Sequence, residues 1–344
     1  MSTTLPFSPV RSTLYSADEL LAPGIPQTPL DWIETADFRI FRHFVMNGGK
    51  SVVRDSYVRL MQSIHDNSIN EAIVELLCKH DRVVAVMGGH KMKRGGADYA
   101  KVVDIARTLS RAGALVVSGG GPGAMEATHL GAAMACASDA DLAAAMKLLS
   151  AVPEIPDNAP KMVGPDGNLD MAAVTAVFEW LKPALAVRKS IAKPGRSLGI
   201  PTWYYGHEPF TPLATHIGKY FQNSLREDGL LAIAAGGVIY SEGRAGTIQE
   251  IFQDAAQNYY ESFGGFSPMV LLGAKYWTET YPVHPLLSAL FVNNGKEAAF
   301  KKSVLMTDDP DAVVAFLMSF PPSEKKHVEN LERFAAPRHY LGRK

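Results

Sequence analysis

The sequence predicts an α/β protein built on a Rossmann-like, doubly wound parallel sheet, with added N- and C-terminal helices and a helical insertion. Short apolar runs rich in β-branched residues alternate with helical segments, as in parallel sheets that helices cover on both faces. Two of these runs lead into glycine-rich loops that each open a helix, at residues 119–126 and 236–250. Because such loops gather at the carboxyl ends of parallel strands, we expect them to form one ligand-binding cleft.

The composition indicates a soluble protein that binds neither nucleic acid nor membrane. Of the 344 residues, 47% are apolar, which is enough for a sizeable core, and the formal net charge of −1 creates no general field for nucleic acid. Cys78 and Cys136 are too few for a disulfide framework or a zinc site, which fits a reducing compartment. The sequence shows no secretory signal and no apolar stretch of membrane-spanning length. We therefore expect a cytoplasmic protein.

Residues 1–80 are expected to form an N-terminal arm followed by a helical layer. Prolines recur up to Pro29, a pattern typical of an extended arm that lies on the surface or on a partner subunit. From residue 31 onward, apolar residues recur at helical spacing, for example at Tyr57, Leu60 and Ile64. This spacing predicts helices that pack before the sheet begins.

Residues 81–275 are predicted to form the Rossmann-like core, and residues 276–344 to form helices packed on it. The pattern changes at about residues 138–196, which we interpret as an insertion that either caps the cleft or serves packing or oligomer formation. Strands are expected at residues 82–88, 114–118, 197–204, 236–241 and 268–273, and helices at 98–112, 139–150, 169–189, 215–225, 247–262, 284–292, 309–320 and 324–334.

The stretch 236–250 has the sequence of a buried strand, a tight loop and the first turn of a helix. Gly243 and Gly246 allow the loop to approach a ligand closely. Thr247 is expected to open the helix, whose first N–H groups lack intrahelical partners and whose dipole favours an anion. The loop is therefore a candidate phosphate site, with Glu250 one turn into the helix. Alternatively, Thr247-x-x-Glu250 is a capping box, in which Glu250 bonds only to the backbone.

Residues 119–126, Gly-Gly-Gly-Pro-Gly-Ala-Met-Glu, repeat this arrangement of strand, glycine loop, helix and early glutamate. Gly119, Gly121 and Ala124 also fit the dinucleotide pattern G-x-G-x-x-A, but that pattern normally follows the first strand of the sheet, and this loop follows the second. The sequence contains no ATP-type phosphate loop, and nothing marks a lysine for pyridoxal phosphate. We expect neither a cofactor nor a metal.

A basic loop at residues 90–94 follows the first predicted strand. Its side chains either approach a phosphate or remain in solvent, and the solvated interpretation is favoured because lysine and arginine are mostly exposed.

Together, the Gly-Gly-Gly-Pro-Gly-x-Met-Glu motif and the Gly-Thr-x-x-Glu motif of residues 246–250 resemble the LOG ("Lonely guy") family, over roughly residues 82–273. Members of this family are phosphoribohydrolases, although many carry an older lysine decarboxylase label. The resemblance implies hydrolysis of the N-glycosidic bond of an AMP-like nucleoside 5′-monophosphate, which releases free base and ribose 5-phosphate. It also implies a homo-oligomer, a dimer or larger.

The resemblance further implies roles for individual residues. Glu250 would stabilise positive charge in the transition state and orient or activate water, while Arg226 would position the ligand. Glu126 would bind the ribose hydroxyls. The other candidate binding residues are Gly88, Gly89, Gly120, Gly121, Gly123, Gly243, Arg244, Ala245, Gly246 and Thr247.

Two departures from the family pattern leave alternatives open. The family's Met-His-x-Arg-Lys segment is matched best by Arg226, whose flanking residues differ, whereas Arg188 and Lys189 keep the dipeptide but precede the third strand. Arg244 stands where the family has glycine, and it either adds a bidentate phosphate contact or crowds the site. A rival interpretation is therefore a nucleotide-binding carrier or regulatory protein without turnover.

Overall fold

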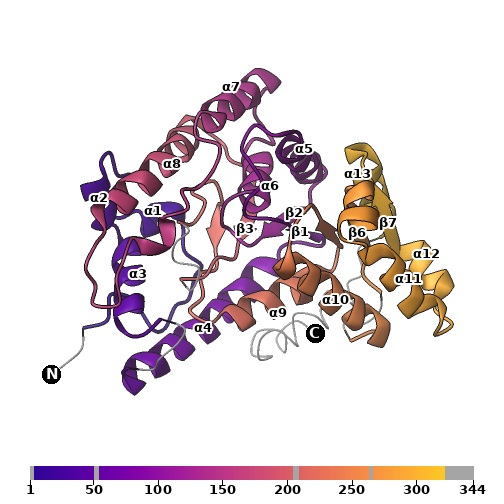
Figure 1. Ribbon diagram of the computed structural model, residues 1–344, viewed down its shortest axis with the longest axis horizontal. Helices are drawn as coiled ribbons and strands as arrows, with labels where there is room; N and C mark the ends of the chain where they lie inside the picture. The colour runs from indigo at the N-terminus through magenta and orange to yellow at the C-terminus, as the bar shows by residue number, and fades with distance from the viewer. Residues whose placement is uncertain (1–3, 50–53, 204–208, 263–265, 322–344) are drawn as a thin grey trace.

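The computed structural model, which describes residues 4–49, 54–203, 209–262 and 266–321, contains a seven-stranded parallel sheet (Figure 1). The strand order β4-β3-β2-β1-β5-β6-β7 places β1 in the centre, with later strands added on each side. This is a doubly wound α/β arrangement, so the predicted fold class is confirmed. The strands are β1 (Val83–Met87), β2 (Leu115–Ser118), β3 (Ser197–Gly199), β4 (His216–Ile217), β5 (Val238–Tyr240), β6 (Met269–Leu272) and β7 (Val304–Thr307).

The helices surround the sheet and bury both of its faces (Figure 1). They are α1 (Ala17–Leu20), α2 (Pro29–Ile33), α3 (Ala36–Met46), α4 (Ser56–Leu77), α5 (Ala97–Arg111), α6 (Ala124–Ala133), α7 (Asp139–Ser150), α8 (Met171–Ser190), α9 (Asn223–Ile233), α10 (Ala245–Tyr260), α11 (Val283–Val292), α12 (Glu297–Ser303) and α13 (Pro310–Ser319), with the short 3₁₀-helix η1 (Ala159–Lys161) and the short π-helix η2 (Tyr276–Thr280). In β1, Val84 and Val86 join a core that includes α5 and α6, whereas Ala85 and Met87 join the core on the other face. This alternation follows from the two-residue period of a strand.

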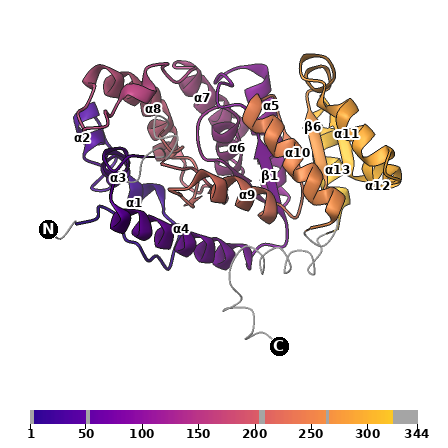
Figure 2. The same cartoon turned by 60° about the horizontal axis from the view of Figure 1, so that its bottom comes forward.

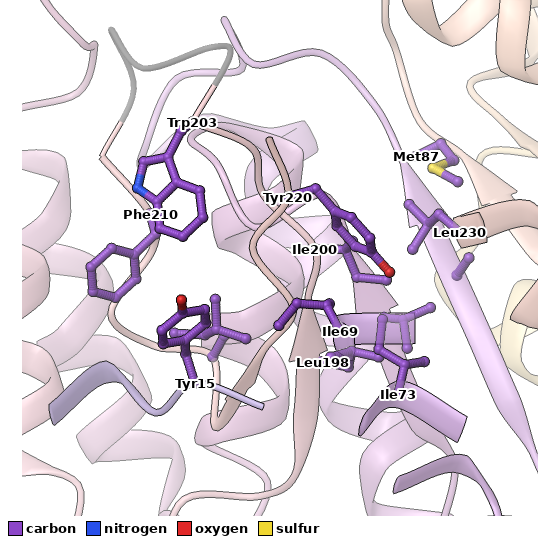
Figure 3. Close-up of a cluster of buried hydrophobic side chains, with 14 of the residues drawn as sticks. Tyr15, Ile69, Ile73, Met87, Leu198, Ile200, Trp203, Phe210, Tyr220 and Leu230 are labelled. Atoms are coloured by element: carbon purple, nitrogen blue, oxygen red, sulfur yellow. The ribbon is translucent and has the colours of Figure 1, made fainter. Parts of the chain in front are cut away.

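The N-terminal segment is packed into the core, and the prediction of an extended surface arm is wrong for the described residues. Phe7, Tyr15 and Leu20 are all buried. The backbone of Tyr15 exchanges hydrogen bonds with Ile217 of β4 at 3.0 and 2.9 Å, so the segment covers the edge of the sheet. The ring of Tyr15 lies beside that of Trp203, with ring centroids 6.0 Å apart (Figure 3). Burial of these large side chains outweighs the tendency of the prolines to keep the segment extended in solvent.

The predicted helical layer is present as α2, α3 and α4, but the predicted apolar face of Tyr57, Leu60, Met61 and Ile64 is wrong for most of its residues. Tyr57, Leu60 and Ile64 on α4 are exposed to 53%, 57% and 37%, whereas Met61 packs partly buried against the core. The helix runs along the edge of the molecule (Figure 2), and it reaches the core mainly through later residues such as Ile69 and Ile73. Helical spacing identified the helix correctly, but it could not tell which apolar stripe meets the sheet.

The predicted helix at residues 215–225 is also wrong. Residues 216–217 form β4, and the helix α9 begins only at Asn223. The carboxylate of Asp66 on α4 accepts hydrogen bonds from the backbone N–H groups of Phe221 and Gln222, each at 2.9 Å. These tertiary contacts hold the chain extended until α9 begins, and they override the local helical pattern.

The remaining elements agree with the sequence in most places. The insertion contains α7 and α8 as predicted, and α11 and α13 match two of the predicted C-terminal helices, whereas α12, β4 and β7 were not predicted. The third strand is shorter than expected, and the predicted helix at 324–334 lies outside the described residues. None of the helices described here is both long enough and apolar enough to cross a bilayer.

The corrected packing of the N-terminus makes a stability prediction. Leu20→Ala should lower the free energy of unfolding by about 2–5 kcal/mol, because Leu20 is fully buried in the core. Leu60→Ala is the matched control and should change it by less than about 0.5 kcal/mol, because Leu60 is exposed. Urea unfolding of both variants measures the difference. Equal stabilities would show that the N-terminal segment does not belong to the folded core.

Candidate functional site

A cavity of about 340 Å³, here called the central cavity, lies at the carboxyl ends of β1, β2 and β5. At β1 the strand order reverses, since β2 and β3 lie on one side and β5 and β6 on the other. Ligands of doubly wound proteins bind at this switch point. The cavity is lined by Val86, Met87, Gly88, Gly89, His90, Gly119, Gly121, Met125, Pro201, Thr202, Pro209, Arg226, Glu227, Arg244, Ala245, Gly246, Thr247 and Glu250.

The second glycine loop places the N-terminus of α10 at the central cavity. The helix begins at Ala245, two residues earlier than expected, and its first internal bond runs from the Ile248 N–H to the Arg244 carbonyl at 2.9 Å. The N–H groups of Ala245, Gly246 and Thr247 precede that bond, and all three residues line the cavity. The positive end of the α10 dipole and these N–H groups make this wall suitable for an anion.

Position 243 requires glycine because the side chain of Thr247 packs closely against it. A Cβ atom at position 243 would lie 2.1 Å from Oγ1 of Thr247 and 2.6 Å from its Cβ. The Tyr276 hydroxyl donates to the Gly243 carbonyl at 2.6 Å and fixes the loop from outside. Gly243 therefore shapes the loop, while Gly246, which also lines the central cavity, has open space where a Cβ would stand.

The capping-box interpretation of Thr247 and Glu250 is wrong. Arg244 is the N-cap residue of α10, so Thr247 lies inside the first turn rather than at its start. Glu250 lines the central cavity, where its Oε1 lies 3.7 Å from Nη1 of Arg226. Its carboxylate is thus placed against a cationic side chain on another helix.

The environment of Glu250 raises its pKa to about 7. Burial is the main cause, because only 9% of the residue is exposed and the ionised form loses water. Arg226 acts in the opposite direction, and the nearby carboxylate of Glu227 raises the pKa further. At neutral pH both the neutral and the ionised form of this carboxyl group are therefore populated, which suits a general acid or base.

Arg226 reaches the cavity from the first turn of α9 and lies between the two glycine loops. Its Nε and Nη2 atoms donate to Oδ1 of Asn223 at 3.3 and 3.0 Å, and Nη2 lies 3.5 Å from Glu227 Oε1. A Cβ atom at Gly119 would lie 3.5 Å from Arg226 Nη1, so the first loop closes over the guanidinium. The prediction that Arg226 and Glu250 belong to one site agrees with this geometry, whereas Arg188 bonds to Asp18 at 2.6 Å, away from the cavity lining.

The first glycine loop contributes Gly119 and Gly121 to the cavity lining, together with Met125. Gly120 and Gly123 have positive φ angles of 73° and 69°, and they serve the shape of the loop. A Cβ atom at Gly123 would lie 2.3 Å from the Gly89 carbonyl oxygen. Gly120 packs in the same way on Pro201.

Glu126, expected to bind ribose hydroxyls, lies away from the central cavity. Its carboxylate is fully buried and accepts from Nε and Nη2 of Arg94, both at 2.6 Å. The Tyr99 hydroxyl donates to it at 3.0 Å. The carboxylate oxygens are used inside the protein, so the sugar-binding role does not fit this arrangement.

The basic loop at residues 90–94 is only partly solvated. Lys91 and Lys93 are exposed and pair with carboxylates of the insertion, but Arg94 is buried and His90 lines the central cavity. The insertion segment at residues 153–160 lines a second cavity of about 210 Å³ with Gly123 and Trp180. Within the described ranges, the insertion contributes no lining residue to the central cavity, so those residues do not form the cap that was considered.

His90 belongs to the basic loop that was considered as a phosphate contact, and it lines the cavity. Other lining residues were not among the predicted ligand contacts, for example Met125, Thr202, Pro209 and Glu227. Met125 belongs to the first glycine motif, and Thr202 and Pro209 follow the carboxyl end of β3, so these two signals could have indicated them. Metal ligation is not suggested by the described part of the chain, where no cluster of three or more His, Cys, Asp or Glu side chains occurs.

Comparison with known proteins identifies similarity to solved structures only. No protein-family model matches the chain, and no curated protein matches it. A similar solved structure is the molybdenum cofactor binding protein from the phototrophic bacterium Rippkaea orientalis, with 13% sequence identity and a TM-score of 0.39. The likeness covers 69% of this chain and 96% of that chain. At this level it assigns no function to the central cavity.

The two glycines of the second loop should respond differently to substitution. Gly243→Ala should lower the free energy of unfolding by about 1–3 kcal/mol, because its Cβ would collide with Thr247. Gly246→Ala should raise it by up to about 1 kcal/mol, since this glycine is helical and a Cβ there meets open space. Thermal unfolding of both variants tests this geometry, and a harmless Gly243→Ala would contradict it.

Proposed function

We propose that this protein hydrolyses the N-glycosidic bond of a nucleoside 5′-monophosphate to give free base and ribose 5-phosphate. The observation that carries the proposal is the buried carboxyl of Glu250, which has a pKa of about 7 and lies beside Arg226 in the same cavity as the α10 N-terminus. The motif resemblance to the LOG family, at residues 119–126 and 246–250, supports the same chemistry.

The 5′-phosphate would bind at the N-terminus of α10. The N–H groups of Ala245, Gly246 and Thr247 supply donors there, and the helix dipole favours the phosphate charge. Arg244 at the lip of the cavity adds a guanidinium that can bind phosphate through two parallel hydrogen bonds. This arrangement holds the phosphate ester at one end of the cavity and leaves the sugar and base to reach the first glycine loop.

Glycosidic cleavage proceeds through a transition state that resembles an oxocarbenium ion. A carboxylate at Glu250 would stabilise the positive charge that develops at the anomeric carbon, and burial strengthens that interaction because little water screens it. Glu250 would also accept a proton from the attacking water as the new C–O bond forms. Arg226 would orient the ligand and offset negative charge on the phosphate or the departing base.

A nucleotide-binding carrier or regulatory protein is the second candidate. Two observations favour it: the side chain of Arg244 occupies a loop position where the family has glycine, and the acidic Glu227 follows Arg226 where the family has lysine. Both residues line the central cavity, so they affect which phosphorylated ligand fits. Both candidate functions require nucleotide binding, but this one predicts tight binding without cleavage of the nucleotide.

Product analysis tests the proposed reaction. The purified protein is incubated with purine and pyrimidine 5′-monophosphates, including N6-substituted ones, and the products are separated by chromatography. We expect free base and ribose 5-phosphate in equal amounts from at least one nucleotide, because the site holds the phosphate and acts on the anomeric carbon. Glu250→Gln should reduce the rate at least about a hundredfold. Inorganic phosphate with an intact nucleoside, or binding without any cleavage, would overturn the proposal.

Thermal stability provides the folding control for Glu250→Gln. The folded-state pKa of Glu250 is raised above its ordinary value of 4.5, so ionisation weakens the fold as pH rises through about 7. At pH 8 the neutral glutamine should therefore leave the protein at least as stable as wild type. A less stable variant would show that Glu250 supports the fold rather than the reaction.

The pH dependence of hydrolysis follows from the same group. Because the carboxylate is the reactive form, kcat/KM should rise through about pH 7. One pH unit below the midpoint, kcat/KM should be about tenfold lower than its high-pH plateau. Glu227→Gln removes a negative neighbour, which should lower the pKa of Glu250 and move the midpoint to lower pH. A rate that falls as pH rises, or a midpoint that Glu227→Gln leaves unchanged, would rule out this role of Glu250.

A further inference from the structure

Arg94 and Glu126 form a buried ion pair next to the first glycine loop. Nε and Nη2 of Arg94 donate to the two carboxylate oxygens of Glu126, each at 2.6 Å. The side chains are 1% and 0% exposed. The two parallel bonds fix the relative orientation of both groups, which a single contact would not do.

The same guanidinium also holds the insertion. Its Nη1 donates to the backbone carbonyls of Trp180 at 2.7 Å and Val152 at 3.2 Å, and its Cζ atom lies 4.0 Å from the centroid of the Trp180 ring. The backbone N–H of Arg94 donates to the Pro153 carbonyl at 3.1 Å. One side chain from the loop between β1 and α5 thus joins α6, α8 and the segment after α7.

These contacts lead directly to the walls of the central cavity. Glu126 lies in the first turn of α6, and the Ala124 N–H of that turn donates to the Gly89 carbonyl at 3.2 Å. Gly123 packs on the same carbonyl, and the Gly89 N–H donates to the carbonyl of Glu242 in the second glycine loop at 2.8 Å. A shift of Glu126 would therefore move Gly89, and Gly89 connects the two glycine loops.

We propose that Arg94 is a positioning residue for the proposed reaction, which fixes the first glycine loop through Glu126 and braces it against the insertion. The inference rests on the proposed function, and it replaces the sugar-binding role expected for Glu126. A buried ion pair contributes little net stability, because desolvation of both charges offsets their attraction. Its contribution here is the fixed geometry of the loops that line the cavity.

Arg107 provides a matched control. It is also a buried arginine, located on α5, with Nη1 donating to Oδ1 of Asp139 at 2.6 Å and Nη2 to the Ala137 carbonyl at 2.6 Å. It therefore attaches the beginning of the insertion to the core in a similar way. Unlike Arg94, it is bonded to residues that do not reach the lining of the central cavity in the described chain.

The first experiment compares Arg94→Lys with Arg107→Lys by calorimetry, with AMP and inorganic phosphate as the probes. Lysine keeps the charge but loses the bidentate geometry. Arg94→Lys should raise the Kd for AMP at least about tenfold and leave the Kd for inorganic phosphate within about threefold, because the phosphate binds at α10. Arg107→Lys should leave both within about threefold. If wild type binds AMP, equal AMP affinities in the two variants would overturn the inference.

The second experiment uses hydrogen–deuterium exchange on the ligand-free protein, so it decides the positioning role even if no nucleotide binds. Arg94→Lys should accelerate exchange at residues 88–91 and 119–123 at least about tenfold, and Arg107→Lys should not. Failure of wild type to bind or cleave any nucleotide would overturn the proposed function alone. Unchanged exchange in Arg94→Lys would overturn the inference alone.

A double variant, Arg94→Met with Glu126→Leu, keeps the test decisive if the single variant does not fold. It removes both charges, so neither is left buried without a partner. Wild-type stability together with accelerated exchange at residues 119–123 would support a positioning role. Wild-type exchange at those residues would show that the pair contributes only to packing.

Discussion

The central interaction of this molecule is the burial of the Glu250 carboxyl beside the Arg226 guanidinium, 3.7 Å away. Burial alone would keep the carboxyl protonated at neutral pH, whereas a close guanidinium alone would keep it ionised. The two effects oppose each other and leave a pKa of about 7. In the proposed reaction this group would transfer a proton, and the N–H groups at the α10 N-terminus, which suit an anion, line the same cavity.

The fold brings these two residues together from different helices. Arg226 lies near the start of α9, and that start is fixed because Asp66 on α4 accepts hydrogen bonds from the backbone just before it. Glu250 lies on α10, whose start is fixed by the close packing of Gly243 on Thr247. The sheet order then places both helix starts at the point where β1 and β5 adjoin. The helical layer that precedes the sheet in sequence thus contributes to the site indirectly, because Asp66 on α4 fixes the start of the helix that carries Arg226.

The sequence was sufficient for the fold class and for the position of the cavity, because strand–glycine–helix patterns are local and the carboxyl ends of parallel strands converge. A resemblance to a family motif also indicated that Glu250 and Arg226 share one site. It was not sufficient for Glu126, because the partner that removes its carboxylate from the cavity, Arg94, is a distant residue in a loop that reads as solvated. Similarly, β4 and the buried N-terminal segment depend on pairing between Tyr15 and Ile217, which no local pattern records.

The most direct test of this account is the pKa of the Glu250 side chain, measured by carbon NMR titration of protein labelled at its glutamate carboxyls. The signal is assigned by its absence from the Glu250→Gln variant. The account predicts one carboxyl that titrates near pH 7, well above the ordinary glutamate value of 4.5. A Glu250 signal that titrates near pH 4.5 would contradict it, because burial would then not raise the pKa of this carboxyl above its ordinary value.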